Sequence, residues 1–179
     1  MLTLLCFVLL FLQIVASDNG CPTDYSYSSD FNKCIKFFDV PATQWDANML
    51  YCKPSGGSLL SIHNSFENSF VFDLQQTIGV ARSWIGATKP PGNNWIWFDG
   101  TNFNYMYGLL DIPSPDDQAK GAYIDLAERK WKVADWSMKL PFFCAATPTT
   151  PPNAKSKASA GSSINNLNRA IRVSSKIGV

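Results

Sequence analysis

The stretch WIWFDGTNFNY, residues 95–105, begins with closely spaced aromatic side chains and continues into Gly, Thr and Asn. Its first part, WIWFDG, is a short apolar run of the kind that forms a strand ending in a turn. Similar runs precede it at residues 83–87 and follow it at residues 122–126, 130–136 and 141–145. The second half of the domain is therefore expected to consist of short antiparallel strands.

A long irregular segment, residues 101–121, interrupts this series of strands. It contains Gly, Pro and Asp residues and shows neither the helical nor the strand period. A loop of about twenty residues inside a compact domain is usually functional. We therefore expect ligand-contacting residues in or beside this segment.

The N-terminal half predicts a hairpin followed by a helix. Residues 21–38 alternate polar and apolar side chains around a central turn. Thr43 is the expected N-cap of the first helix. The apolar face of that helix is expected at helical spacing, on Trp45, Met49 and Cys52.

A short apolar strand, residues 59–62, and a second helix come next. Asn64 and Glu67 form the capping pair expected at the start of this helix. Its apolar stripe is expected to contain Phe66, Phe70 and Leu74. Two helices with several short strands indicate an α+β domain.

Residues 1–17 have the features of a secretory signal peptide. An apolar run at residues 4–12 is too short to span a bilayer, and the segment ends in the small residues Ala16 and Ser17. Cleavage is expected before Asp18. The mature protein is therefore expected to be secreted and extracellular.

Residues 147–179 are rich in Thr, Pro, Ser, Ala and Lys, which predicts a disordered tail after a domain at residues 18–146. The domain carries 10 Lys and Arg and 14 Asp and Glu, a net charge of −4, whereas the tail carries 5 basic residues and no acidic residue. A folded domain of net negative charge does not favour nucleic-acid binding. No segment after Cys144 is apolar enough to span a membrane.

The cysteine count indicates disulfides. Cys6 belongs to the signal peptide, which leaves Cys21, Cys34, Cys52 and Cys144 in an oxidising compartment, where two disulfides are expected. Counting allows three pairings, although the first two cysteines could pair across the N-terminal hairpin. A zinc site is not indicated, because the chain has no C-x-x-C and only one histidine.

Several motifs together resemble the C-type lectin-like domain in its long form with an N-terminal hairpin. The stretch at residues 95–105 is close to the family's W-x-W-x-D-G-x-x-F-x-Y, and WIGA at residues 84–87 is close to its W-I-G-L. The remaining matches are Cys21-Pro22 and Cys34, then Trp45, Ala47 and Cys52, GGSLLSI at residues 56–62, Glu67 with Phe70, and Lys130-Trp131 followed thirteen residues later by Cys144.

The resemblance implies a fold with two helices, small antiparallel sheets, a long irregular loop region and two disulfides. It implies the pairs Cys21–Cys34 and Cys52–Cys144, and it implies core positions for Trp84, Trp95 and Trp97. Carbohydrate binding is the activity it implies. In overall plan the chain looks similar to small secreted lectin-like proteins of nematodes, for which innate defence is an expected setting.

Two family features are missing from this sequence. The family usually has a second cysteine pair in this half of the domain, and those positions hold Ala122 and Trp136. The family's W-N-D motif supplies an asparagine and an aspartate to the sugar-binding calcium, and it reads Trp131-Lys132-Val133 here. Calcium requires six to eight oxygen ligands. Because lysine and valine supply none, we expect no calcium cofactor and no other metal.

The other half of the family's calcium site flanks a cis-proline, for which this chain offers Pro113 and Pro115. Neither frame supplies the paired side-chain carbonyls of the mannose-type or galactose-type motif. A rearranged calcium site at Asp116, Asp117 and Asp135 is the less favoured alternative, because clustered aspartates in an exposed loop are more often solvated.

An enzymatic site is not indicated. His63 is the only histidine, the mature chain has no free cysteine, and no G-x-S-x-G elbow is present. The sequence therefore predicts a non-enzymatic recognition protein.

Trp136 is expected to pack on the apolar cluster of the long loop at residues 105–110, with an exposed recognition patch as the alternative. We consider two kinds of partner. The first is a glycan bound without calcium and stacked on Tyr107 or Trp136, and the second is an extracellular protein bound through the face of the long loop. The candidate ligand-contacting residues are Tyr107, Ser114, Asp116, Asp117, Lys132 and Trp136.

Overall fold

The computed structural model describes residues 20–108 and 120–149. The helical elements are α2 (Gln44–Asp46), η1 (Ala47–Cys52), η2 (Lys53–Ser55) and α3 (Ser65–Ile78). The strands are β1 (Ser26–Ser28), β2 (Lys33–Ala42), β3 (Gly57–Leu59), β4 (Arg82–Lys89), β5 (Ile96–Trp97), β6 (Lys120–Asp125), β7 (Lys130–Asp135) and β8 (Leu140–Ala146). The candidate residues Ser114, Asp116 and Asp117, both candidate prolines, the predicted signal peptide and the residues of the predicted tail beyond 149 lie outside the described residues.

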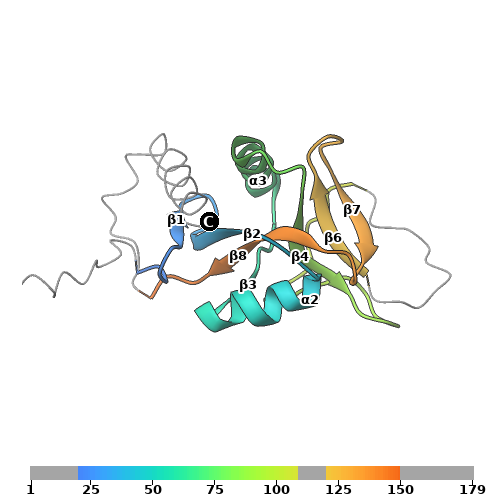
Figure 1. Ribbon diagram of the computed structural model, residues 1–179, viewed down its shortest axis with the longest axis horizontal. Coiled ribbons are helices and arrows are strands. Elements are labelled where there is room, and N and C mark those ends of the chain that lie inside the picture. Colours follow the sequence, from blue (N-terminus) through green and yellow to red (C-terminus); the bar gives the residue numbers. More distant parts are fainter. Residues whose placement is uncertain (1–19, 109–119, 150–179) are drawn as a thin grey trace, which may run out of the picture.

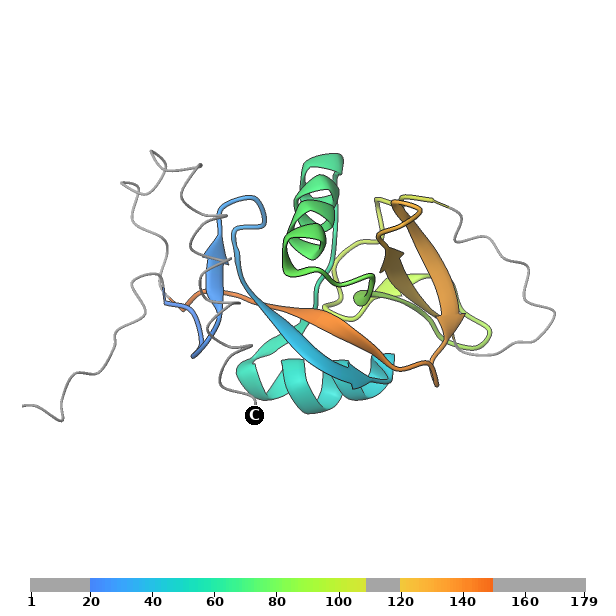
Figure 2. The ribbon, with the colours of Figure 1, turned by 45° about the horizontal axis from the view of Figure 1, so that its top comes forward.

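The strands form one hydrogen-bonded sheet with helices on both sides. Its order is β1-β2-β8-β4-β6-β7, with β3 paired to β8 and β5 paired to β4. The pairings are antiparallel except that of β4 with β8, where Trp84 lies opposite Phe142. Figure 1 shows α3 on one side of the central strands and the helix that begins with α2 on the other, and the turned view in Figure 2 keeps this arrangement.

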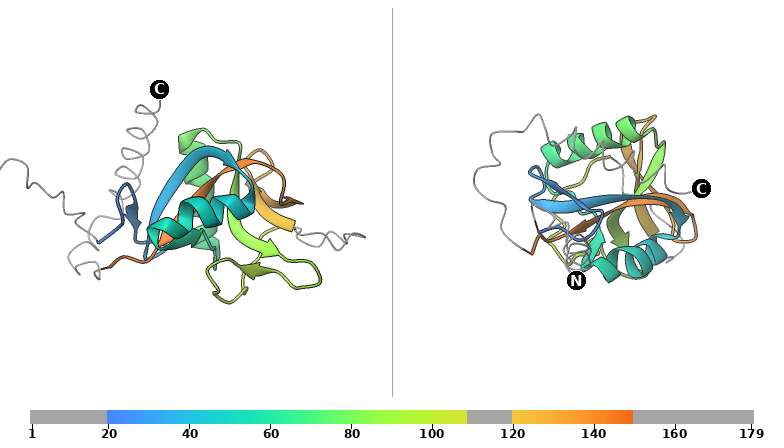
Figure 3. Two further views of the ribbon diagram at one scale, coloured as in Figure 1. Left: turned by 60° about the horizontal axis from the view of Figure 1, so that its bottom comes forward. Right: turned by 60° about the vertical axis from the view of Figure 1, so that its left-hand side comes forward.

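The predicted N-terminal hairpin and both disulfides are confirmed. β1 pairs with β2, and Cys21 is bonded to Cys34 across this hairpin. Cys52, at the end of η1, is bonded to Cys144 in β8. The second disulfide closes 92 residues, so in the loop-entropy account it contributes about 4 to 5 kcal/mol. It ties the first helix to the last strand, which runs beside β2 through the middle of the fold (Figure 3).

The first helix begins as predicted but buries a different face. The Thr43 side chain accepts a hydrogen bond from the Asp46 amide at 3.1 Å, which confirms the N-cap. The prediction of an apolar face was wrong for Trp45 and Met49, which are 48% and 41% exposed. The buried residues are Gln44, Ala47, Asn48 and Cys52.

Polar side chains occupy this buried face because they complete the hydrogen bonding of neighbouring backbone. Gln44 Nε2 donates to the carbonyl oxygens of Ile85 and Ala87, each at 2.9 Å. Asn48 Oδ1 accepts from the Leu59 amide at 3.0 Å. Leaving such buried carbonyl and amide groups unpaired would cost about 1 to 3 kcal/mol each. The α2–η1 helix therefore anchors β3 and β4 through side-chain amides.

The second helix is confirmed, with a similar shift in its buried face. Asn64 Oδ1 accepts from the amides of Phe66 and Glu67, while Glu67 accepts from the His63 amide. Leu74 is buried as predicted, but Phe66 is 81% exposed, so its place in the apolar stripe was wrong. Phe72, Val71, Asn68 and Gln75 complete the buried face.

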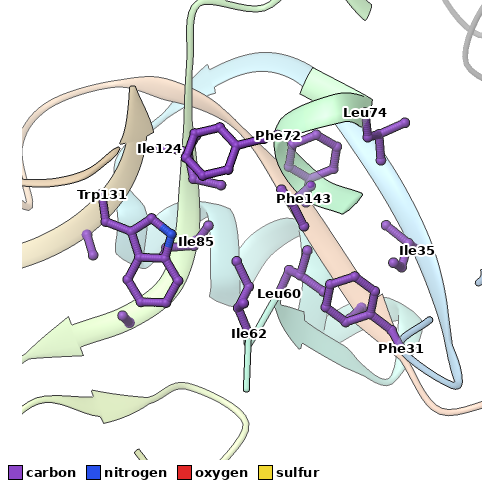
Figure 4. Close-up of a cluster of buried hydrophobic side chains, with 14 of the residues drawn as sticks. Phe31, Ile35, Leu60, Ile62, Phe72, Leu74, Ile85, Ile124, Trp131 and Phe143 are labelled. Atoms are coloured by element: carbon purple, nitrogen blue, oxygen red, sulfur yellow. The ribbon is translucent and has the colours of Figure 1, made fainter. Parts of the chain in front are cut away.

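The sheet separates two groups of buried side chains. The α3-side cluster includes Phe72 of α3, Ile85 and Trp131 of the sheet, and Phe143 (Figure 4). The α2-side cluster includes Ala47 and the buried Trp84, Tyr123 and Phe142. Trp84 and Trp97 are at most 1% exposed, which confirms their expected core positions, and Trp95 packs against the α3-side cluster. Trp131 is also buried, at 1% exposed.

Both ends of the domain meet at one place. The Thr149 amide and hydroxyl donate to the carbonyl oxygen of Gly20 at 2.9 and 3.0 Å.

In the part of the chain that the structure describes, no helix is both long and apolar enough to cross a membrane.

Candidate functional site

The β6–β7 hairpin fixes the side chain of Lys132 over acidic residues. Lys132 lies opposite Tyr123 in the strand register, so its side chain projects on the α2 side of the sheet. Its Nζ donates to Glu128 and lies 3.7 Å from Asp125 Oδ2. Asp125 is buried and also accepts from Arg82 Nε at 3.1 Å and from the Glu128 amide at 3.2 Å. The Lys132 ammonium is therefore already held by two carboxylates.

In this ion cluster (Arg82, Asp125, Glu128 and Lys132) the surrounding groups shift the pKa values of Asp125 and Lys132 toward their charged forms. Burial raises the pKa of Asp125, but the Glu128 amide, Lys132 and Arg82 outweigh burial and lower it. The pKa of Lys132 is raised, chiefly by its hydrogen bond to Glu128. Lys132 therefore remains a cation where the family has a calcium-ligating asparagine.

The strand half of the family's calcium site does not fit calcium in this chain. Val133, at the aspartate position, packs against the α3-side cluster and offers no oxygen. Asp135, one member of the alternative site, forms an ion pair with Lys120. Within residues 20–108 and 120–149, no group of three His, Cys, Asp or Glu side chains is arranged to hold a metal ion.

Trp136 lies on the α2 side of the sheet, just after β7. Its indole Nε1 donates to the Lys120 carbonyl oxygen at 2.8 Å and to Thr88 Oγ1 at 3.1 Å. Its ring stacks on Trp45, with centroids 6.0 Å apart and an interplanar angle of 25°. Trp45 also meets the ring of Phe98 edge-on at 6.2 Å. We call Trp45, Phe98 and Trp136 the aromatic patch.

Trp136 packs on Trp45 in the aromatic patch, which differs from the packing predicted for it. The prediction placed Trp136 against the loop at residues 105–110, of which the structure describes residues 105–108. Tyr105 instead packs on Trp131, and Tyr107 packs on Phe72, both in the α3-side cluster. Trp136 contacts α2 because alternation along β7 directs Trp131 and Val133 to one side of the sheet and the even-numbered residues to the other.

The structure brings together only some of the predicted ligand-contacting residues. Lys132 and Trp136 project on the α2 side of β7, and Tyr107 lies on the α3 side, where its carbonyl oxygen accepts from the Trp131 amide at 3.2 Å. Trp136 follows Trp131 by five residues, about 16 Å along an extended chain. One sugar ring cannot therefore stack on Tyr107 and Trp136 at once.

Sequence reasoning missed the exposure of Trp45 and the contact that the partly buried Phe98 makes with it. Trp45 was assigned to a buried helix face by its spacing, and Phe98 was read only as part of a motif. The sequence did contain a sign that Trp45 could face outward. Its neighbour Gln44 directly follows the N-cap, and only one of these two adjacent helical residues can point into the core. Helical spacing alone does not show that the side-chain amide of Gln44, and not the indole of Trp45, is the buried group.

A polar network holds the start of the long loop. The Thr101 hydroxyl donates to Asp99 at 2.5 Å, and Ser61 and Lys33 donate to the same carboxylate at 2.6 and 3.0 Å. Burial raises the pKa of Asp99, but these bonds and that from the Thr101 amide outweigh burial and lower it to about 2. Asp99 therefore anchors the turn that follows β5.

The His63 ring joins this network as a hydrogen-bonding side chain. It lies 3.1 Å from Thr101 Oγ1 and 3.1 Å from Asn104 Oδ1. The Thr101 hydroxyl, which donates to Asp99, thus also contacts the imidazole of His63. These contacts tie the His63 ring to the start of the long loop.

The comparisons with known proteins agree with this fold. Residues 42–146 match the family model described as the lectin C-type domain. The chain is 29% identical over 124 residues to regenerating islet-derived protein 3-beta of Mus musculus, covering 64% of this chain and 71% of that protein. It is 28% identical over 135 residues to the galactose-specific lectin nattectin of Thalassophryne nattereri, covering 71% and 80%.

A solved structure shows the same likeness. Human lithostathine superposes with a TM-score of 0.61 at 26% sequence identity, over 70% of this chain and 90% of that chain. The family match spans more than half of the 179 residues and contains the β6–β7 hairpin, the aromatic patch and the disulfide from Cys52 to Cys144. The chain therefore belongs to the family of the lectin C-type domain.

Proposed function

We propose that this protein is a secreted, non-enzymatic recognition protein that binds carbohydrate without calcium. The observation that carries the proposal is the engagement of Lys132 with Glu128 and Asp125. At the position of a calcium ligand this chain holds a cation with its own carboxylate partners. A calcium ion there would meet a repelling ammonium and would lack the oxygen of the neighbouring position, Val133.

Carbohydrate is the ligand class that the family supports. Nattectin, a relative that aligns with 71% of this chain, is described as a galactose-specific lectin. The aromatic patch offers exposed ring surface of the kind that contacts the C–H face of a sugar, and Trp45 is 48% exposed. Secretion rests on the leader at residues 1–17 and agrees with two disulfides, which persist in oxidising compartments.

The experiment is glycan-array binding of the mature protein, measured once with millimolar calcium and once with EDTA. The account predicts binding to a defined set of glycans with equal intensity in both buffers. A calcium-dependent lectin on the same array serves as the matched control, and its signal should disappear in EDTA.

Two outcomes would contradict the proposal in different ways. Glycan binding that EDTA abolishes would show that calcium is required despite Lys132. An array without signal, together with capture of a defined extracellular protein partner, would favour protein recognition as the function.

A further inference from the structure

We propose that two copies of this chain form a symmetric dimer through the outer face of the first helix, which consists of α2, η1 and η2. The surface consists of Asp46, Met49, Leu50 and Lys53, which we call the helix stripe. Its occupant is the helix stripe of a second copy. The inference goes beyond the proposed function, because it concerns association of the chain with itself and needs no ligand.

The centre of the helix stripe is apolar and open to solvent. Leu50 is 65% exposed and Met49 is 41% exposed. The opposite face of the helix, with Ala47 and Cys52, is buried in the α2-side cluster. Figure 3 shows this helix at the outer surface of the domain. Adjacent large apolar side chains that face solvent mark a contact surface.

A charged side chain lies at each end of this apolar centre. Asp46 precedes Met49 by three residues and Lys53 follows Leu50 by three residues, so all four side chains share one face of a helix. Lys53 is exposed, Asp46 is partly exposed, and Lys53 Nζ donates to the Ser58 hydroxyl at 2.9 Å. Within residues 20–108 and 120–149, neither charge takes part in an ion pair. Both charges are therefore available to a partner.

The order of residues in the helix stripe makes it complementary to itself. In a two-fold symmetric interface, a residue that contacts a second residue of the other copy is contacted by its own counterpart in return. If two first helices lie antiparallel about an axis between Met49 and Leu50, Asp46 of each copy meets Lys53 of the other. The apolar residues then meet at the axis, and the two helix dipoles oppose each other favourably.

Charge also distinguishes a second copy from other occupants. The helix stripe carries one negative and one positive side chain, Asp46 and Lys53. A partner surface of a single sign would attract one end of the stripe and repel the other. A second copy, placed antiparallel, satisfies both ends at once and covers the apolar centre.

The size of the surface predicts a weak dimer. One short helix is smaller than the roughly 800 Å² per partner that a standard interface buries. We therefore expect a Kd on the order of 10 to 100 μM and an exchange between monomer and dimer. A dimer carries two recognition domains, so its binding to a repeated ligand gains avidity.

Sedimentation velocity of the mature full-length chain, from about 5 to about 500 μM, tests this association across the Kd range of a weak interface. A shift from monomer to dimer is expected as the concentration rises. Leu50→Asp puts like charges at the axis and should raise the Kd about tenfold or more. Phe66→Asp is the matched control, because Phe66 is 81% exposed but lies on α3, on the other side of the sheet. Its Kd should equal that of the unmodified protein.

Charge reversal tests the two-fold geometry itself. Asp46→Lys and Lys53→Glu each place like charges opposite one another, so each variant alone should stay monomeric where the unmodified protein dimerises. An equimolar mixture of these two variants should associate again, because both pairs across a mixed dimer are then opposite in charge. The double variant Asp46→Lys/Lys53→Glu should dimerise by itself for the same reason. Far-ultraviolet circular dichroism reports whether each variant is folded.

Recovery of the dimer in the mixture and in the double variant supports the inference. A chain that stays monomeric at every concentration overturns it and leaves the helix stripe to a different partner. Association that survives Leu50→Asp, or that Phe66→Asp weakens equally, also overturns it, because the interface then lies elsewhere. Loss in both single variants without recovery in the mixture contradicts the antiparallel pairing. The glycan array tests the proposed function separately from all of these outcomes.

Discussion

The indole Nε1 of Trp136 lies 2.8 Å from the carbonyl oxygen of Lys120 and joins the end of β7 to the start of β6. In this family the same region usually carries a disulfide, at the positions of Ala122 and Trp136. A disulfide across a loop of about fifteen residues contributes about 3 kcal/mol, whereas a hydrogen bond contributes about 1 kcal/mol. The tryptophan thus keeps a connection between the two strand ends and also places an aromatic ring beside Trp45.

The first prediction concerns this connection. Trp136→Phe keeps a ring beside Trp45 but removes the donor to Lys120 and Thr88, so the free energy of unfolding should fall by about 1 to 2 kcal/mol. Chemical denaturation measures the change. The exposed substitution Leu50→Ala is the control and should stay within about 0.5 kcal/mol. Equal stability of Trp136→Phe and the unmodified protein would show that these hydrogen bonds do not hold the strands.

The second prediction concerns the buried amide of the first helix. Gln44→Leu cannot donate to the carbonyl oxygens of Ile85 and Ala87, so two buried acceptors lose their partner. The expected loss is about 2 to 4 kcal/mol of unfolding free energy. Thermal unfolding checks it. A neutral or stabilising effect would mean that apolar packing, and not hydrogen bonding, determines this side chain.

The third prediction concerns pH. The pKa of Asp99 is about 2 in the folded protein, below its ordinary value of about 4, so its contribution to stability is present above pH 4 and is lost as the pH falls toward 2. Asp99→Asn should therefore cost about 2 kcal/mol at neutral pH. Denaturation curves of the two proteins should converge near pH 2. A constant difference across this range would show that Asp99 is not stabilised as its carboxylate.

The fourth prediction concerns the ion cluster. Lys132→Met removes a cation from beside Asp125, so the pKa of the Asp125 carboxyl should move upward. Carboxyl carbon NMR titration measures that pKa. Lys89→Met is the control, because Lys89 lies at the opposite end of β4 from Arg82. An unchanged Asp125 pKa in Lys132→Met would mean that Arg82 and the Glu128 amide alone account for it.

Sequence alone predicted most of the fold, because the patterns that define it are local. The helix caps at Thr43 and Asn64 depend on side chains within three residues of the backbone they satisfy. The hairpin of β1 and β2 is likewise a short-range pattern. The disulfide from Cys52 to Cys144 followed from the family resemblance, since counting cysteines left three pairings open.

The face of the first helix could not be predicted from its spacing. Trp45 and Met49 are apolar and recur at helical spacing, but the inward positions belong to Gln44 and Asn48 because only their amides complete the bonding of buried backbone. That requirement arises from strands far away in the sequence. Because Trp45 was predicted to be buried in the core, its stacking with Trp136 in the aromatic patch was not predicted.

The placement of the candidate ligand-contacting residues in the fold could be predicted only in part. Alternation along β7 correctly distinguishes Lys132 from the buried Trp131, since the two side chains point to opposite sides of the sheet. The position of Tyr107 could not be predicted in this way, because its loop has no regular alternation of polar and apolar residues. Its ring packs on Phe72 and its carbonyl oxygen bonds to β7, and both contacts are distant in sequence.

The most direct test of calcium-free recognition is the melting temperature of the mature protein in millimolar calcium and in EDTA. A site with a Kd a hundredfold below the calcium concentration would add about 2.7 kcal/mol, which raises the melting temperature of a domain of this size by several degrees. Because Lys132 and Val133 stand at two ligand positions, we predict melting temperatures equal within about 1 °C. A rise of several degrees with calcium would contradict the account.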